Sequence, residues 1–127
     1  MQFKENNKAI YLQIADTICD RVLDGTFPPE SRIPSVREYA AEVEVNANTV
    51  MRAYDHLASL GIIYNKRGIG YFICPDAVGE VHNLRRRELL EGDMPTFFHR
   101  LRLLGITPQE LAALYSEYCS TNNTPEK

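Results

Sequence analysis

Residues 33–63 read IPSVREYAAEVEVNANTVMRAYDHLASLGII, and this stretch decides the fold. Ser35 with Glu38 three positions later has the pattern of a capping box, which begins a short helix. A few residues further on, Asn46 or Asn48 can cap a second helix. The apolar residues of both helices recur at helical spacing, which gives each helix one buried face. These faces are Val36, Tyr39, Ala40 and Val43 in the first helix, and Val50, Ala53, Tyr54, Leu57 and Leu60 in the second. Two short helices joined by so tight a turn predict a helix-turn-helix.

The residues on either side complete a small domain. A longer helix is expected from about Lys8 to Asp24, with Ile10, Ile14, Ile18 and Val22 on one face. The three prolines in Thr26–Pro34 forbid a continuous helix and make a stiff connector. After Gly61, two β-prone runs predict a β-hairpin whose tip holds Lys66, Arg67 and Gly68. A helix-turn-helix followed by a basic-tipped hairpin predicts a winged helix-turn-helix over residues 1–75.

Pro75 and Asp76 mark the boundary to a helical tail, residues 76–127. One helix is expected up to Glu91, with Gly92 as its stop and Asp93 as the cap of the next helix. Thr107, Pro108 and Glu110 supply a cap, an N1 proline and a capping-box acid for the last helix. The predicted fold is mostly α with a small β-hairpin.

The tail carries an apolar stripe that so short a segment cannot bury alone. We therefore expect a second chain to cover it, which makes the protein a homodimer. The residues assigned to this dimerisation surface are Phe97, Phe98, Leu101, Leu104, Leu111, Leu114, Tyr115 and Tyr118.

Length and composition exclude several classes of protein. At 127 residues a two-domain enzyme is not expected, and the sequence has no nucleophile and base constellation or phosphate-binding glycine loop. No apolar run reaches the roughly 20 residues that span a bilayer, and residues 1–7 are too polar for a signal peptide, so we expect a cytoplasmic protein. The three cysteines and three histidines lack metal-site spacing, and neither a metal nor a cofactor is expected.

The net charge of −3 gives no support to nucleic-acid binding. Residues 1–75 hold eight Lys and Arg against nine Asp and Glu, and residues 76–127 hold six against eight. A DNA-binding face must therefore come from clustering of cations rather than from total charge. The acidic balance also suits a winged helix that binds proteins instead of DNA, and this alternative stays open.

The residue types at the expected interface suit DNA. Asn48, Thr49 and Arg52, with Asn46, can offer donors and acceptors to base edges from the start of the second helix of the motif. Ser35 and Arg37 can hold phosphates, Lys66 and Arg67 can lie along the backbone or in the minor groove, and Gly68 lets the wing approach closely.

Each of these residues also has a simpler interpretation. Arg37 can pair with Glu38 or Glu42, and Arg52 with Asp55 or His56. One of the two asparagines is expected to be only a helix cap. The run Arg85–Arg87 is best explained as a solvated helix face.

The order of these segments resembles the GntR-type bacterial regulators. The resemblance covers Tyr11 to Ile73 and rests on these pieces in family order: Tyr11–Ala15, Gly25–Phe27, Arg32–Ala40, Val45–Val50, Ala53-Tyr54, Leu57, Gly61–Ile63 and Gly68–Phe72. It implies a DNA-binding repressor, with Arg37, the start of the helix capped by Asn46 or Asn48, and Gly68 at the DNA. The short tail, with Leu103–Pro108 before its last helix, resembles the YtrA-type branch, in which the tail is chiefly a dimerisation unit.

Two positions depart from the family pattern. Glu30 stands where glycine is common, and Ala47 stands where many relatives carry arginine. The resemblance implies a homodimer on a pseudo-palindromic operator in double-stranded DNA. It names neither the operator, nor the regulated genes, nor a small-molecule effector.

Overall fold

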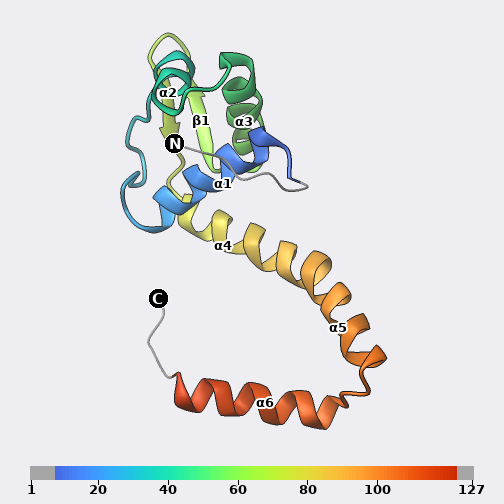
Figure 1. Cartoon of the computed structure of the whole chain (residues 1–127). Coiled ribbons are helices and arrows are strands. Elements are labelled where there is room, and N and C mark those ends of the chain that lie inside the picture. The colour runs from blue at the N-terminus through green and yellow to red at the C-terminus, as the bar shows by residue number, and fades with distance from the viewer. Residues whose placement is uncertain (1–7, 123–127) are drawn as a thin grey trace. The chain divides into compact units, whose positions relative to one another are not determined.

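The computed structural model describes residues 8–122, which divide into two compact units after Arg85 (Figure 1). The first unit contains α1 (Ile10–Leu23), α2 (Val36–Val43), α3 (Ala47–Ser59), β1 (Ile63–Lys66), β2 (Gly70–Ile73) and most of α4 (Ala77–Glu88). The second contains the end of α4, the π-helical turn η1 (Leu89–Asp93), α5 (Met94–Leu103) and α6 (Pro108–Thr121). The fold is therefore mostly helical with one antiparallel hairpin, as the sequence predicts.

The helix-turn-helix forms where the capping pattern places it. The Ser35 hydroxyl accepts the Glu38 N–H at 3.1 Å, and the Glu38 carboxylate accepts the Ser35 N–H at 2.9 Å. α2 ends at Val43, and its C-cap residue Glu44 adopts a left-handed conformation (φ 60°, ψ 50°). Asn46 then caps α3, its side-chain oxygen accepting the Asn48 N–H at 2.7 Å. Of the two asparagines, Asn46 is thus the cap, and the turn between the helices is only three residues long.

The core of the first unit lies where α1, α2, α3 and the hairpin meet. Its buried residues are Ile14, Ala15, Ile18, Cys19, Val22, Ile33, Tyr39, Ala40, Val43, Val50, Ala53, Tyr54, Leu57, Ile62, Ile63, Ile73, Ala77 and Val81. The expected helix faces agree with this core at most positions. Ile10 is an exception, because its side chain is 41% exposed at the first turn of α1, and Val36 and Leu60 are half-buried.

The turn of the hairpin lies one residue later than the sequence predicts. Lys66 is the last residue of β1 and pairs with Gly70, so the turn consists of Arg67, Gly68 and Ile69. The Ile69 N–H donates to the Lys66 carbonyl at 2.8 Å and closes this turn. Gly68 has a φ of +77°, a conformation that glycine adopts without the steric cost of a Cβ.

The proline-rich connector extends the base of the hairpin. The Ile33 N–H donates to the Tyr71 carbonyl at 3.0 Å, and the Ile73 N–H donates to the Ser31 carbonyl at 2.9 Å. Because these bonds satisfy the outer edge of β2, the wing is anchored on both sides. The connector thereby fixes the wing to the residues that directly precede α2.

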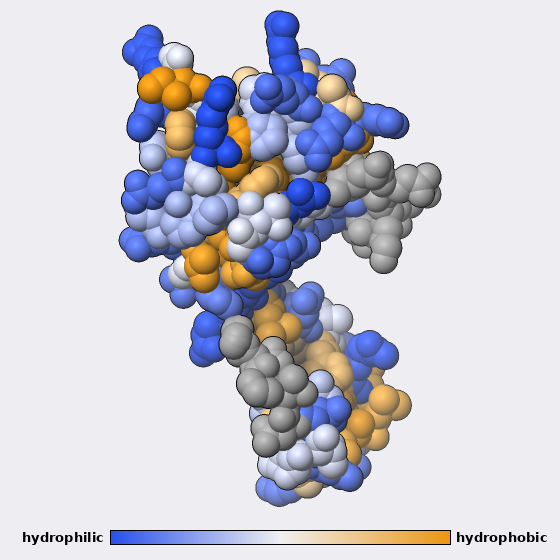
Figure 2. Space-filling view, turned by 90° about the vertical axis from the view of Figure 1, so that its left-hand side faces the viewer, coloured by the Kyte–Doolittle hydropathy of each residue, from blue (hydrophilic) through white to orange (hydrophobic). Residues whose placement is uncertain are grey.

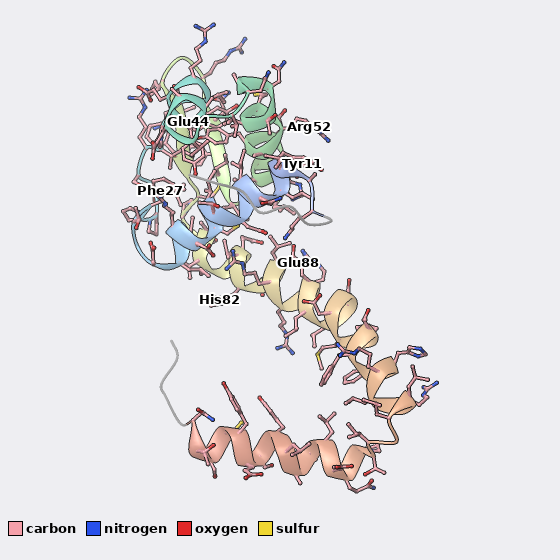
Figure 3. The ribbon with its side chains drawn as sticks, in the orientation of Figure 1. Tyr11, Phe27, Glu44, Arg52, His82 and Glu88 are labelled. Carbon is pink, nitrogen blue, oxygen red and sulfur yellow. The ribbon has the colours of Figure 1, made fainter. Side chains whose placement is uncertain are left out.

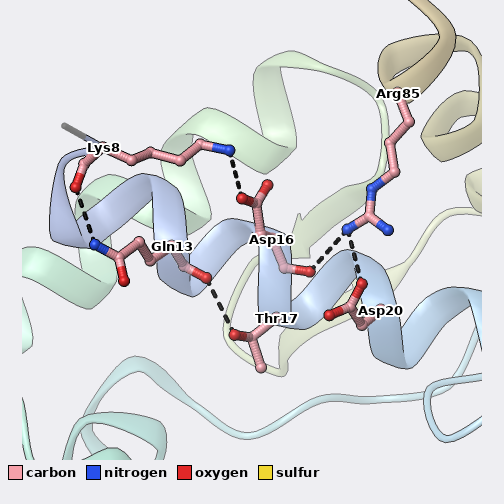
Figure 4. A network of polar contacts seen from close by, with 6 residues as sticks. All are labelled: Lys8, Gln13, Asp16, Thr17, Asp20 and Arg85. Carbon is pink, nitrogen blue, oxygen red and sulfur yellow. Dashed lines mark hydrogen bonds and ion pairs between the residues drawn. The ribbon is translucent and has the colours of Figure 1, made fainter. Parts of the chain in front are cut away.

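The start of α4 belongs to the first unit by packing. Ala77 and Val81 are fully buried in its core. Arg85 reaches across to α1, where its Nη2 donates to the Asp16 carbonyl at 3.1 Å and pairs with the Asp20 carboxylate at 2.9 Å (Figure 4). The interpretation of Arg85–Arg87 as a solvated face is thus wrong for Arg85, because a long-range partner on α1 engages it, and holds for its two exposed neighbours.

Two predictions in the tail are wrong. Gly92 does not end a helix and Asp93 does not cap one, because α4 continues through η1 into α5 with helical backbone angles. Pro95 explains the π-helical turn, since proline has no N–H and its ring crowds the carbonyl four residues earlier, and a widened turn relieves that clash. The widened turn is closed by the Met94 N–H, which donates to the Leu89 carbonyl five residues back.

The last helix begins as predicted. The Thr107 side chain accepts the Glu110 N–H at 3.1 Å, and Pro108 occupies the first helical position. Within residues 8–122, no helix is long and apolar enough to cross a membrane.

Two tyrosines in the core of the first unit differ in the hydrogen bonding of their hydroxyl groups. The Tyr54 hydroxyl donates to the Pro34 carbonyl at 2.7 Å, whereas the buried Tyr39 hydroxyl has no hydrogen-bond partner in the described part of the chain. The two rings lie 6.4 Å apart, and burial raises the pKa of both phenols. The pair therefore offers an internal comparison of a satisfied and an unsatisfied buried hydroxyl.

We expect Tyr54→Phe to lower the free energy of unfolding by about 1 kcal/mol, because it leaves the Pro34 carbonyl without its donor. Tyr39→Phe removes a hydroxyl that gains nothing from burial, and it is expected to leave stability unchanged or raise it by up to about 1 kcal/mol. Urea unfolding followed by circular dichroism measures both changes. An equal loss of stability in the two variants would contradict this assignment.

Candidate nucleic-acid interface

The start of α2 presents Ser35 and Arg37. Ser35 uses its hydroxyl oxygen as the cap, which leaves the hydroxyl hydrogen available to a phosphate. The hydrogen bond from the Ser35 backbone lowers the pKa of the Glu38 carboxyl, so the partner in the capping box stays ionised. Arg37 is exposed in the first turn and has no ion-pair partner among residues 8–122, so the pairing with Glu38 or Glu42 is not formed.

The start of α3 presents Asn46, Asn48 and Thr49. Capping occupies the side-chain oxygen of Asn46 but leaves both hydrogens of its amide nitrogen free to donate. Asn48 is exposed on the outer side of α3, opposite the buried residues Val50 and Ala53. Thr49 is half-buried beside it. The first turn of α3 therefore offers both donors and acceptors.

Arg52 lies on a different flank of α3 from the wing. Its guanidinium carbon is 4.1 Å from the centre of the Tyr11 ring on α1, and His56 meets the same ring edge-on at 6.0 Å (Figure 3). Arg52 is thus held by a cation–π contact rather than by Asp55. Stacking leaves the N–H edge of a guanidinium free for other partners.

The wing carries Lys66, Arg67 and Gly68 at and beside its turn. The Lys66 ammonium lies 4.9 Å from the centre of the Phe72 ring, so it lies against the hairpin. Arg67 and Gly68 are exposed in the turn itself. In Figure 1 the hairpin loop and the start of α3 lie at the same end of the unit as α2.

Sequence reasoning missed two further residues at this end. Arg32 packs its guanidinium over Gly70, where an added Cβ would come within 2.8 Å of Arg32 Nε. Met51 is 41% exposed on α3, and its sulfur accepts the Tyr71 hydroxyl at 4.0 Å. The sequence alone does not place Arg32 next to Gly70. The contact becomes evident only when the pairing of β1 with β2 is known.

The exposed cations cluster although the chain is acidic. Arg32 before α2, Arg37 on α2, and Lys66 and Arg67 at the wing are all exposed. The exposed acidic residues nearby in the sequence are Glu38 and Glu42 on α2 and Glu44 at its C-cap. Figure 2 shows hydrophilic side chains projecting from the surface of the first unit. The pairs of Asp16 with Lys8 and of Asp20 with Arg85 are each neutral and leave the net charge unchanged. A locally positive face is thus compatible with a net charge of −3.

The second unit presents an apolar surface. All buried side chains of the described residues belong to the first unit, and nine of the fourteen exposed large apolar residues lie in the second. Leu101 and Leu111 are half-buried between α5 and α6, with grooves on either side of them. The other predicted dimerisation residues are exposed, namely Phe97, Phe98, Leu104, Leu114, Tyr115 and Tyr118.

The chain is similar in sequence to known transcriptional regulators over most of its length. YhcF, an HTH-type transcriptional regulator of Bacillus subtilis, is 40% identical over 109 residues, which cover 84% of this chain and 87% of that protein. YtrA, an HTH-type transcriptional repressor of the same organism, is 36% identical over 95 residues, covering 75% and 67%. These relatives extend beyond the winged unit into the tail.

A solved structure shows the same architecture. A GntR-family transcriptional regulator from Bacteroides thetaiotaomicron is 49% identical, covers 90% of this chain and 99% of its own, and superposes with a TM-score of 0.79. Residues 10–73 match the sequence profile described as bacterial regulatory proteins, gntR family. The resemblance expected from the sequence is confirmed, and the chain belongs to the GntR family of bacterial regulatory proteins.

Proposed function

We propose that this chain is a repressor that binds a pseudo-palindromic operator as a homodimer, with one α3 in the major groove of each half-site. The observation that carries the proposal is the gathering of the α2 start, the α3 start and the cationic wing at one end of the first unit. This arrangement suits a duplex, because a helix can enter the major groove while the wing follows the adjacent backbone. Occupation of the operator then blocks transcription.

The candidate interface residues fall into two groups. One group suits contacts with base edges, and the other suits contacts that position the protein on the DNA backbone. Asn46, through its free amide hydrogens, and Asn48 with Thr49 suit base edges. Ser35, Arg37, Lys66 and Arg67 suit phosphates, and Gly68 lets the wing turn approach the backbone.

Arg52 has a separate role in this arrangement. Because Tyr11 holds its guanidinium on the α1 flank, we assign it to a phosphate beside the groove rather than to a base. A stacked guanidinium is pre-organised and loses little freedom on binding.

We assign dimerisation to the apolar surface of the second unit. A unit without a buried side chain among its described residues gains burial from another chain, and a second copy offers the same apolar residues in a self-complementary arrangement. The alternative, a winged helix that binds proteins without DNA, predicts no enrichment of any DNA sequence. Selection from a random duplex pool decides between the two, because the repressor enriches a two-fold symmetric site.

Arg37→Ala is expected to weaken binding to the selected operator at least tenfold, since each protomer loses a charge-assisted contact. The slope of log affinity against log salt should fall by about one for each lost phosphate contact. Arg86→Ala is the matched control, because Arg86 is an exposed arginine outside the winged unit and should leave both quantities unchanged. Titrations at several salt concentrations measure them. Equal affinities for wild type and Arg37→Ala would contradict the role of Arg37.

Two substitutions of Asn46 separate capping from base reading. Asn46→Ser keeps a good cap and the melting temperature but removes the amide donors, so operator affinity or base preference should change. Asn46→Ala loses the cap as well and is expected to cost about 1 kcal/mol of stability. Thermal unfolding and repeated site selection give the two readouts. If Asn46→Ser selects the same site with wild-type affinity, Asn46 is a cap only.

Leu104→Ser is expected to shift the dimer towards monomer, because the Leu104 side chain is 73% exposed in the single chain and apolar contacts there are lost. Val78→Ser, at an exposed apolar residue of α4 within the first unit, is the matched control. Sedimentation velocity over a range of protein concentrations measures the dissociation constant. A wild-type protein that sediments as a monomer at all concentrations would overturn the assignment of the tail.

A further inference from the structure

An apolar strip lies on the wing-facing flank of α3. Ala47 and Met51 are one helical turn apart, and both are exposed. Neither belongs to the core, to which α3 contributes Val50, Ala53, Tyr54 and Leu57. This strip lies on the helix that the proposed function places in the major groove, directly beside Asn48. On a helix that enters the major groove, exposed apolar side chains can contact the apolar groups that base edges present there.

The hairpin holds Met51 in place. The Tyr71 hydroxyl donates to the Met51 sulfur at 4.0 Å. The Tyr71 ring is itself fixed, because it meets the Tyr54 ring edge-on with 4.9 Å between the centroids. The Met51 side chain is therefore directed towards the wing and keeps an exposed apolar surface on the groove side of α3.

The major groove offers one apolar mark, the C5-methyl group of thymine. A methionine side chain suits it, because the thioether is polarisable and adapts its shape to a small apolar group. Ala47, one turn earlier, leaves room for a base edge to approach the helix.

We propose that Met51, flanked by Ala47, is a specificity-determining residue that recognises a thymine methyl group in each half-site. The inference rests on the proposed function, since it requires α3 to enter the groove. Asn48 and Met51 are neighbours on the helix surface, so hydrogen-bond reading and methyl reading act on adjacent base pairs.

The test replaces single thymines of the selected operator by deoxyuridine, which removes the methyl group and leaves every hydrogen-bonding group in place. For the wild-type protein, we expect one thymine in each half-site at which this change weakens binding about fourfold, the effect of exposing one apolar carbon. Met51→Gln keeps the length of the side chain but makes its end polar, and it should bind the thymine and uracil operators equally. Met51→Leu should keep the preference, and so should Val78→Ala, the control at a distant exposed apolar residue.

Each comparison of thymine with uracil is made within one protein. A loss of folded protein in a variant therefore cancels in the ratio. The inference is overturned if no thymine is methyl-sensitive, or if Met51→Gln retains the full preference at the sensitive position, which would assign the methyl contact to another residue. Either outcome leaves the proposed function intact, whereas failure of the wild-type protein to select any site would remove that function itself.

Discussion

Tyr54 of α3 contacts both other elements that carry candidate interface residues, α2 and the wing. Its hydroxyl donates to the carbonyl of Pro34, immediately before the cap of α2, at 2.7 Å. Its ring contacts Tyr39 of α2 on one side and Tyr71 of β2 on another. One buried side chain on α3 thus contacts both the residue before the cap of α2 and the second strand of the wing, and so links the three elements that carry the candidate interface residues. The geometry of the interface depends on this contact more than on any surface residue.

The sequence predicted those features that neighbouring residues control. The capping box of α2 and the start of α6 were predicted, and the cap of α3 was narrowed to Asn46 or Asn48, because a cap joins groups only two or three residues apart. One failure arose where a distant residue decides. Arg85 is engaged by α1, and no local pattern points to a partner 65 residues earlier. The failure at Gly92 is local, because a glycine can continue a helix when the flanking residues favour it.

The candidate interface follows the same division. The residue types at the starts of α2 and α3 could be predicted because helix starts are where polar side chains and free N–H groups collect. The orientation of Arg52 could not, since it depends on Tyr11 of another helix. Arg32 and Met51 were missed for the same reason, because the hairpin register places Gly70 and Tyr71 against them. Net charge does not report how charges are distributed, because it sums exposed cations such as Arg37 and Arg67 with acidic residues throughout the chain.

The two units bury their apolar residues in different ways, and this difference has a consequence for regulation. The first unit closes its own core, with all eighteen buried apolar residues between Ile14 and Val81. The second keeps Leu104, Tyr115 and similar side chains exposed as a single chain, so burial there depends on an encounter with another molecule. Assembly through such a surface follows mass action, and stability gained on assembly grows with protein concentration. Under the proposed dimerisation, affinity for a symmetric DNA site is coupled to the amount of protein present, because each dimer carries two DNA-binding units.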